Sequence, residues 1–195
     1  MPPIAGRVRQ TTCSYTAHFA EYAESVPTWF LRHGESDANA AGVFAGQGVD
    51  SPLTVVGRNQ ARHAAALVPT EVEWIVASPL SRAVATAEIV RQICGISFDV
   101  EIDPRAIEYD VGSAAGLRTR PMTAIEMTER FGAEDPDEFA VRVRSLLDDL
   151  SLREGAGLLV SHAGVGRMIR TLCQGRQPSE FRDQALPENA SLFLI

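Results

Sequence analysis

The chain is poor in cysteine and has no long apolar run. Its three cysteines, Cys13, Cys94 and Cys173, are far apart and never in CxxC spacing, so the pattern indicates neither a disulfide framework nor a zinc knuckle. A reducing environment fits this content best, and we predict a cytoplasmic protein. No stretch approaches the about 18 apolar residues of a membrane span, and residues 1–27 lack the apolar core of a signal peptide.

Basic residues are also in short supply. Eighteen Lys and Arg residues stand against 25 Asp and Glu residues, for a net charge of -7. This balance argues against general binding of nucleic acid or of an anionic membrane, since both need a broad basic surface. A small anionic substrate is compatible with it, because the field inside a pocket need not follow the net charge.

The chain does contain enough apolar sequence for one globular domain. At 195 residues, with 45% hydrophobic and 22% charged residues, it has the composition of an ordinary soluble globule, and it shows no internal repeat or low-complexity linker. Apolar runs predict strands at 29–31, 74–77 and 158–160, with further candidates at 98–102 and 191–195. Helical patterns lie between them: one capped by Thr54 and reaching about Val68, one with Pro79 in its first turn and reaching about Ile93, and others at 123–131, 138–150 and 163–172. The alternation predicts a single three-layer α/β domain with a mainly parallel sheet flanked by helices.

The segment before the first strand has a different character. Prolines and arginines open it, and Tyr15, Phe19, Tyr22 and Val26 follow at roughly helical spacing. We predict that residues 1–27 form an N-terminal arm with a short docking helix, and that residues 28–195 form the domain.

Three predicted strand ends carry cationic groups. LRHGES follows the first strand, ASPLSRA the second and VSHAG the last long one. Because the carboxyl ends of parallel strands meet at one edge of a sheet, Arg32, His33, Arg82 and His162 are expected to converge there. Such a convergence predicts an oxyanion pocket, with phosphate as its occupant.

These residue types suit phosphoryl transfer. A guanidinium grips phosphate oxygens with a planar fork of donors and stays charged throughout the reaction. A neutral imidazole can attack phosphorus and form a phosphohistidine, while the second histidine would serve as a positively charged partner of the oxyanion. The leaving alkoxide needs a proton, and Glu108, in RAIEYDVG, is the carboxyl that we assign to this role and to activation of water afterwards.

The chain resembles the histidine phosphatase superfamily, also called the phosphoglycerate-mutase-like fold, from about residue 28 to 195. The resemblance rests on LRHGES with Asn39, DSPLTVVGRNQA, SPLSRAVATAEI, IEYDVGSAAG, VSHAG and LPENAS, in family order. It implies His33 as the nucleophile, Arg32 and Arg82 as phosphate ligands, Glu108 as the acid and His162 as the second histidine. Further residues that it suggests are Asn39 for phosphate and Ser36, Gly46, Gln47 and Ala163 for substrate contact. Many members read GEWEG where this chain has GSAAG at 112–116, which implies altered contacts near the acid-bearing loop.

The sequence therefore predicts a metal-independent phosphomonoester hydrolase of the phosphatase branch, without a cofactor, acting through phospho-His33. A small phosphorylated metabolite is the expected partner, and a phosphoprotein is less favoured. One alternative is a cofactor-dependent phosphoglycerate mutase, which needs a longer covering segment than the two predicted helices after Glu108 leave room for. Another is a weakly catalytic domain that binds phosphorylated ligands. A metal site of His33, Glu108 and His162 is disfavoured because the flanking arginines repel a cation.

Overall fold

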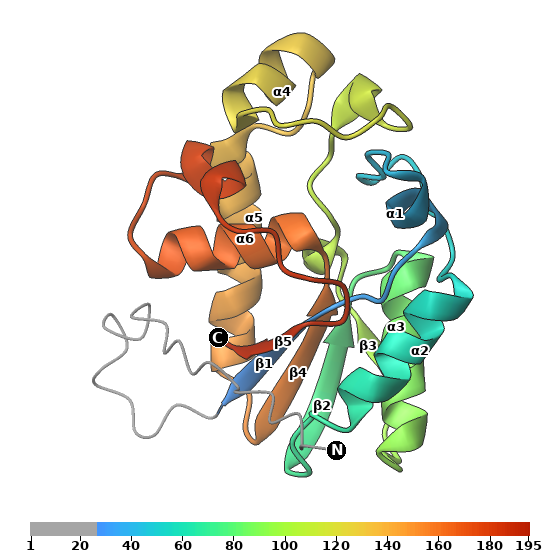
Figure 1. Cartoon of the computed structure of the whole chain (residues 1–195). Coiled ribbons are helices and arrows are strands. Elements are labelled where there is room, and N and C mark those ends of the chain that lie inside the picture. Colours follow the sequence, from blue (N-terminus) through green and yellow to red (C-terminus); the bar gives the residue numbers. More distant parts are fainter. Residues whose placement is uncertain (1–26) are drawn as a thin grey trace, which may run out of the picture.

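The sheet has five strands. The computed structural model describes residues 27–195, so the predicted docking helix lies outside the described residues and stays a prediction. The strands are β1 (Thr28–Arg32), β2 (Val72–Ala77), β3 (Glu101–Ile102), β4 (Ala156–Ser161) and β5 (Leu192–Leu194). Their order is β3-β2-β4-β1-β5, with β5 antiparallel to β1 and the other pairs parallel (Figure 1). The predicted α/β fold with a mainly parallel sheet is confirmed.

Helices cover both faces of this sheet. They are α1 (Asp37–Ala41), α2 (Val55–Ala65), α3 (Ser81–Ile93), α4 (Ala124–Phe131), α5 (Pro136–Ser151) and α6 (Ala163–Cys173), with 3-10 turns η2 (Pro104–Ala106), η3 (Gly112–Ala114) and η4 (Pro178–Asp183). Figure 1 shows α2 and α3 on one face and α5 and α6 on the other. The molecule therefore has the three predicted layers.

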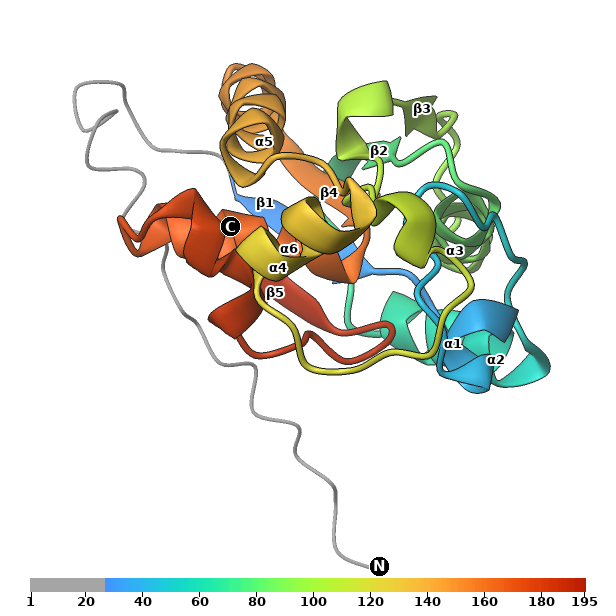
Figure 2. The same cartoon turned by 90° about the horizontal axis from the view of Figure 1, so that it is seen from above.

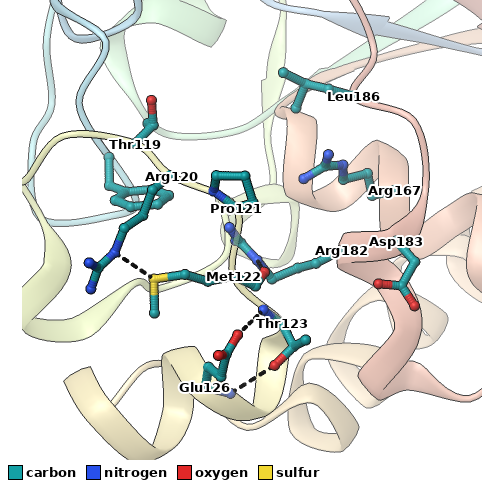
Figure 3. A pocket seen from close by; sticks show the side chains of 11 residues that line it. Thr119, Arg120, Pro121, Met122, Thr123, Glu126, Arg167, Arg182, Asp183 and Leu186 are labelled. Atoms are coloured by element: carbon teal, nitrogen blue, oxygen red, sulfur yellow. Dashed lines mark hydrogen bonds between the residues drawn. The ribbon is translucent and has the colours of Figure 1, made fainter.

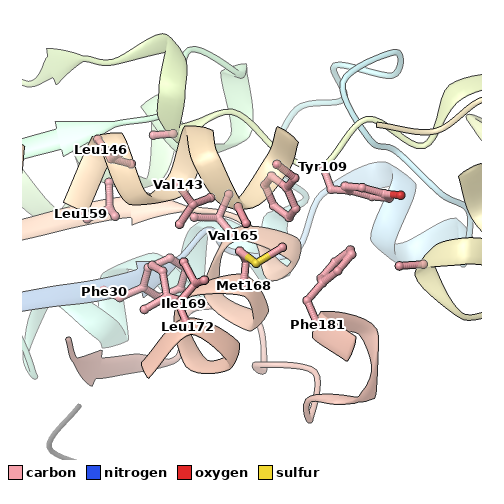
Figure 4. Close-up of a cluster of buried hydrophobic side chains, with 14 of the residues drawn as sticks. Phe30, Tyr109, Val143, Leu146, Leu159, Val165, Met168, Ile169, Leu172 and Phe181 are labelled. Carbon is pink, nitrogen blue, oxygen red and sulfur yellow. The ribbon is translucent and has the colours of Figure 1, made fainter. Parts of the chain in front are cut away.

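Successive side chains of a strand point to opposite faces of the sheet, so a hydrophobic cluster forms on each face. On β4, Leu159 faces α5 and α6, where it joins a cluster with Phe30 of β1, Val143 of α5 and Met168 of α6 (Figure 4). Leu158 and Val160 face the other way and belong to the cluster under α2 and α3. Since every residue of β4 is buried, the strand reads as an unbroken apolar run, as expected of a central parallel strand.

The helix ends follow local signals. Thr54 caps α2 by accepting a hydrogen bond from Gly57 N at 2.9 Å. Thr123 and Glu126 form a capping box on α4, and Asp135 caps α5, with Pro136 at its first position. The sequence placed these helices correctly, although α2 stops at Ala65, three residues before the predicted end.

Two predicted elements need correction. The strand predicted at 98–102 is only the two-residue β3, because this edge strand pairs with just Val76 and Ala77 at the end of β2. The helix predicted to contain Pro79 in its first turn begins at Ser81, with Leu80 as N-cap.

The two cysteines within residues 27–195 are in different states. Cys94 is free and exposed, whereas Cys173 is disulfide-bonded, which the cysteine spacing did not lead us to expect. Within residues 27–195, no helix has both the length and the apolar character needed to cross a membrane.

Candidate active site

The parallel strands deliver the predicted residues to one edge of the sheet. Arg32 is the last residue of β1 and His33 follows it, while His162 follows β4 and is the N-cap of α6. Arg82 lies in the first turn of α3, just beyond the end of β2. Figures 1 and 2 show α4 at the end of the molecule toward which these strands point. We call Arg32, His33, Arg82 and His162 the candidate phosphate site.

The hydrogen bond of His33 defines its tautomer. His33 Nδ1 lies 2.6 Å from the carbonyl oxygen of Gly34. A carbonyl oxygen only accepts, so Nδ1 carries the proton and Nε2 keeps its lone pair. Burial is the main reason that the pKa of His33 lies well below its ordinary value; Arg32 and Arg82 lower it further, and the bond to Gly34 opposes them. His33 is therefore a neutral imidazole with the nitrogen needed for nucleophilic attack.

His162 lies beside His33 in a different hydrogen-bonding environment. The ring centroids are 5.0 Å apart and the rings meet edge to face. His162 Nε2 is 2.6 Å from Ser78 Oγ, and His162 Nδ1 is buried without a protein partner. Burial, then His33 and the arginines, lower the pKa of His162. The positive charge predicted for His162 is thus opposed in this structure, although a phosphate dianion beside it would favour that charge.

The two arginines are held by backbone carbonyls. Arg32 Nη1 donates to Pro187 O at 2.5 Å, and its Nε is buried without a protein partner. Burial lowers the pKa of Arg32 to about 10, against an opposing effect of Glu108, so the side chain stays charged at neutral pH. Arg82 is 1% exposed and donates to the carbonyls of Gly46 (2.9 Å) and Val49 (3.2 Å). Both cations are fixed before any ligand binds, which reduces the entropy cost of binding.

Glu108 is anchored at the N-terminus of α6. Its Oε1 accepts hydrogen bonds from Tyr109 N at 2.8 Å and Gly164 N at 3.0 Å. Both donors are main-chain N–H groups, so the backbone fixes the position of this carboxyl group. A Cβ on Gly164 would lie 2.3 Å from Glu108 Oε1, so this approach requires glycine. Glu108 opposes the lowering of the pKa of both Arg32 and Arg82 by burial, so the predicted acid lies near the candidate phosphate site.

Asn39 and Ser36 support this site from α1. They form a capping box, in which Ser36 N donates to Asn39 Oδ1 at 3.2 Å and Asn39 N donates to Ser36 Oγ at 3.4 Å. Asn189 Nδ2 donates to Asn39 Oδ1 at 3.1 Å and to His33 O at 3.2 Å, which ties α1 to the backbone of His33. Ser36 is fully buried, so its visible role is capping. Ligand contacts of both residues stay predictions.

The other predicted substrate residues, Gly46, Gln47 and Ala163, lie on segments that hold Arg82, Glu108 and His162. Gly46 offers its carbonyl to Arg82, and Gln47 Nε2 donates to Glu108 O at 2.8 Å. Ala163 is the first residue of α6 and is 9% exposed. Direct contact of these three residues with substrate is untested and stays a prediction.

Two buried hydroxyl groups at the site were not predicted from the sequence. Thr86 Oγ1 accepts from Gly34 N at 3.1 Å and donates to Arg82 O at 2.7 Å, which joins α3 to the loop that carries His33. Ser78 holds His162 and also accepts from Leu80 N at 3.3 Å. Thr86 lies four residues after Arg82, one helical turn away, and this spacing was the available signal.

An ion pair that holds the acid-bearing loop was not predicted from the sequence either. Arg142 of α5 donates to Glu134 through Nε (3.0 Å) and Nη2 (2.8 Å). The same guanidinium donates to the carbonyls of Arg105 and Ile107 at 2.8 Å each, and to that of Glu108 at 3.4 Å. Arg142 is therefore a positioning residue for Glu108.

We expect Arg142→Met to lower kcat/KM for alkyl phosphates by about 10- to 100-fold, because a displaced Glu108 delivers its proton poorly. Arg144→Met is the matched control, since Arg144 is exposed on the same helix. Steady-state kinetics on glycerol 3-phosphate, well below the melting temperature of each variant, measures the effect. Equal activity of the two variants would contradict the positioning role.

No metal site accompanies this arrangement in the described part of the chain. Within residues 27–195, no group of three or more His, Cys, Asp and Glu side chains is placed to hold a metal ion. His33, Glu108 and His162 are not placed as such a group.

Comparison with known proteins identifies the family. The model of the histidine phosphatase superfamily (branch 1) matches residues 28–195, and the chain belongs to this superfamily. A probable phosphoglycerate mutase GpmB of Enterobacter sp. (strain 638) is 38% identical, with 74% of this chain and 73% of that protein covered. A 2,3-bisphosphoglycerate-dependent phosphoglycerate mutase of Thermoplasma acidophilum is 32% identical, with 68% of each chain covered. The predicted family is confirmed.

Solved structures show the same fold. The mycobacterial glucosyl-3-phosphoglycerate phosphatase Rv2419c, in complex with VO3, superposes with a TM-score of 0.72 at 24% identity and covers 86% of this chain and 91% of its own. Bacillus stearothermophilus YhfR superposes with a TM-score of 0.76 at 24% identity and covers 88% and 91%. At this identity the likeness establishes the shared architecture alone.

Proposed function

We propose that the protein is a metal-independent phosphomonoester hydrolase that works through a phosphohistidine on His33. The observation that carries the proposal is the neutral His33, whose Nδ1 is bonded to Gly34 O and whose Nε2 keeps a free lone pair beside Arg32, Arg82 and His162. A histidine with this tautomer can attack phosphorus, and the surrounding donors suit the three non-bridging oxygens.

In the first step Nε2 of His33 attacks phosphorus. The new P–N bond forms as the P–O bond to the leaving oxygen breaks, and protonated Glu108 gives its proton to that oxygen. Arg32 and Arg82 neutralise the charge on the phosphoryl oxygens, and His162 offers the hydrogen-bonding nitrogen Nδ1, which has no protein partner. The product alcohol then leaves.

In the second step water replaces the alcohol. Glu108, now a carboxylate, takes a proton from water as the water oxygen attacks phosphorus, and the P–N bond breaks to release inorganic phosphate. This returns His33 to the neutral state and Glu108 to the protonated state. The positive charge for both steps comes from side chains, so the mechanism needs no metal ion.

A phosphoglycerate mutase is the second candidate, and the relatives with that name favour it. A mutase must shield phosphohistidine from water while its intermediate reorients, which calls for a substantial covering segment. Between Glu108 and β4, helices α4 and α5 take up much of the chain. This favours water as the acceptor of the phosphoryl group.

We also propose that the substrate of the hydrolase is a small phosphorylated metabolite and that the protein is cytoplasmic.

The test separates these reactions by their products. We expect release of inorganic phosphate from 3-phosphoglycerate and from simple monoesters, unchanged by a chelator, and slow or no interconversion of 2- and 3-phosphoglycerate. Rapid interconversion that depends on added 2,3-bisphosphoglycerate, with little phosphate released, would assign the mutase instead. Phosphate release lost in chelator and restored by zinc or magnesium would support a metal mechanism. Tight binding without either reaction would leave the weakly catalytic binding domain.

A further inference from the structure

A second group of arginines lines a pocket beside the candidate phosphate site. The pocket has a volume of about 710 Å³, and its walls include Arg120, Arg167 and Arg182 (Figure 3). Glu126 and Asp183 also line it. The pocket is therefore mixed in charge, with cations in excess by one, and none of its arginines belongs to the candidate phosphate site.

The walls of this pocket continue the segments that build the phosphate site. Phe44 lies two residues before Gly46, which binds Arg82, and Leu186 precedes Pro187, which binds Arg32. Arg167 lies about one turn along α6 from Gly164, which holds Glu108. Arg167 also lowers the pKa of Arg32 electrostatically, so the pocket and the candidate phosphate site are neighbours. A substrate whose ester phosphate lies in that site can extend its other end toward the pocket.

Arg167 has an unsatisfied hydrogen-bond donor. Its Nε is buried and has no hydrogen-bond partner in the protein. Burial is the main cause that lowers the pKa of Arg167, and Arg182 lowers it further while Glu108 and Asp183 oppose this. An unpaired donor on a half-buried cation is costly, and an anion that accepts from it would recover that cost.

Arg182 is oriented by the opposite wall. Its Nε donates to Met122 O at 2.8 Å, and its guanidinium lies 5.7 Å from the ring centroid of Phe44. The main-chain bond and the ring hold the planar fork in place and leave its Nη groups available to a ligand.

The two acids of the pocket are engaged with groups of their own. Glu126 Oε2 accepts from Thr123 N at 2.7 Å in the capping box of α4. Asp183 Oδ2 lies 3.7 Å from Arg176 Nη2, outside the pocket lining. Both acids thus have partners of their own, whereas Arg167 Nε has none in the described part of the protein.

We propose that Arg167 and Arg182 bind a second anionic group of the substrate, a carboxylate, so that the enzyme prefers phosphomonoesters of carboxylic acids. A carboxylate fits better than a second phosphate because the two nearby acids leave the pocket only weakly cationic, and each carboxylate oxygen can accept a hydrogen bond from both arginines. This inference rests on the proposed function, since it extends the same substrate from the phosphate site.

The test uses two substrates that differ only at the far end. 3-Phosphoglycerate carries a carboxylate where glycerol 3-phosphate carries a hydroxymethyl group. We expect wild-type kcat/KM to be about 10-fold or more higher for the acid, and Arg167→Gln to reduce the ratio of the two values by about 10- to 100-fold, mainly through KM. Arg167→Lys keeps the charge but not the planar guanidinium, so its ratio should lie between those of the wild type and Arg167→Gln.

Arg130→Gln is the matched control. It removes the same charge from the exposed surface of α4, near the pocket but outside its lining, and should keep the wild-type ratio. Circular dichroism melting shows whether each variant is folded. Equal kcat/KM for both substrates in the wild type, or the same ratio in Arg167→Gln, would overturn the second site and leave the hydrolase intact.

A different result is expected if the proposed function itself is wrong. No monoester is then hydrolysed, and calorimetric binding of 3-phosphoglycerate and glycerol 3-phosphate tests the carboxylate site instead. Tighter binding of 3-phosphoglycerate to the wild type than to Arg167→Gln would support the site. Equal binding of both compounds by both proteins would overturn it.

Discussion

Substitution of His33 by alanine is expected to lower phosphomonoester turnover by about 10⁴-fold or more, because the covalent route then has no nucleophile. The wild type should carry a covalent phosphoryl label during turnover, retained after an alkaline quench and lost after an acid quench, since phosphohistidine is acid-labile. The variant should carry none. Rapid quenching with labelled substrate measures both effects.

His63→Ala is the matched control, because His63 is exposed on α2, away from the strand ends. It should keep both turnover and label. Near-normal activity of His33→Ala would reject the phosphohistidine mechanism, and so would a label that survives acid.

The same measurement followed against pH reports the state of His33. Its pKa is lowered well below the ordinary value of 6.5, so the neutral, reactive form persists as the pH falls below 6.5 and is lost only near the lowered pKa. As the pH is lowered, kcat should therefore begin to fall only well below pH 6.5. Activity that still rises below about pH 4 would contradict a neutral imidazole nucleophile.

Replacement of Glu108 by glutamine is expected to act selectively on substrates with poor leaving groups. Glutamine can still accept the hydrogen bond from Gly164 N, but it cannot donate or take the transferred proton. For glycerol 3-phosphate, kcat/KM should fall by about 10²- to 10³-fold. For p-nitrophenyl phosphate, whose leaving group departs without a proton, the fall in kcat/KM should be much smaller.

The comparison of kcat/KM is decisive because it reports the steps up to phosphorylation of His33. Glu129→Gln, an exposed change of the same kind on α4, should leave both substrates unaffected. An equal loss for the two substrates would show that Glu108 acts by charge or position and does not protonate the leaving group.

Much of the fold was predictable because its signals are local. The apolar runs at 29–31 and 158–160 lie inside β1 and β4. Thr54 and Thr123 are the N-caps of α2 and α4. Edge pairing was less predictable, and the candidate at 98–102 shortened to β3 because the neighbouring strand offers it only two partners.

The sequence by itself determined the superfamily and the principal residues of the candidate site. His33 and His162 each follow a buried strand, and parallel strands bring their carboxyl ends to one edge, so this proximity follows from the order of the elements. Segments in family order then pointed to Arg32, Arg82 and Glu108.

Only the tertiary structure decided how these groups are oriented and charged. The contact of His162 with Ser78 joins residues 84 positions apart, and the Arg142 bonds that hold the acid-bearing loop span 34 to 37 positions. The pocket with Arg167 and Arg182 likewise combines α6 and η4 with the segment before α4. No local pattern encodes such contacts, because each depends on side chains brought together by the packing of separate elements, and burial in that packing sets the pKa of His33 and His162.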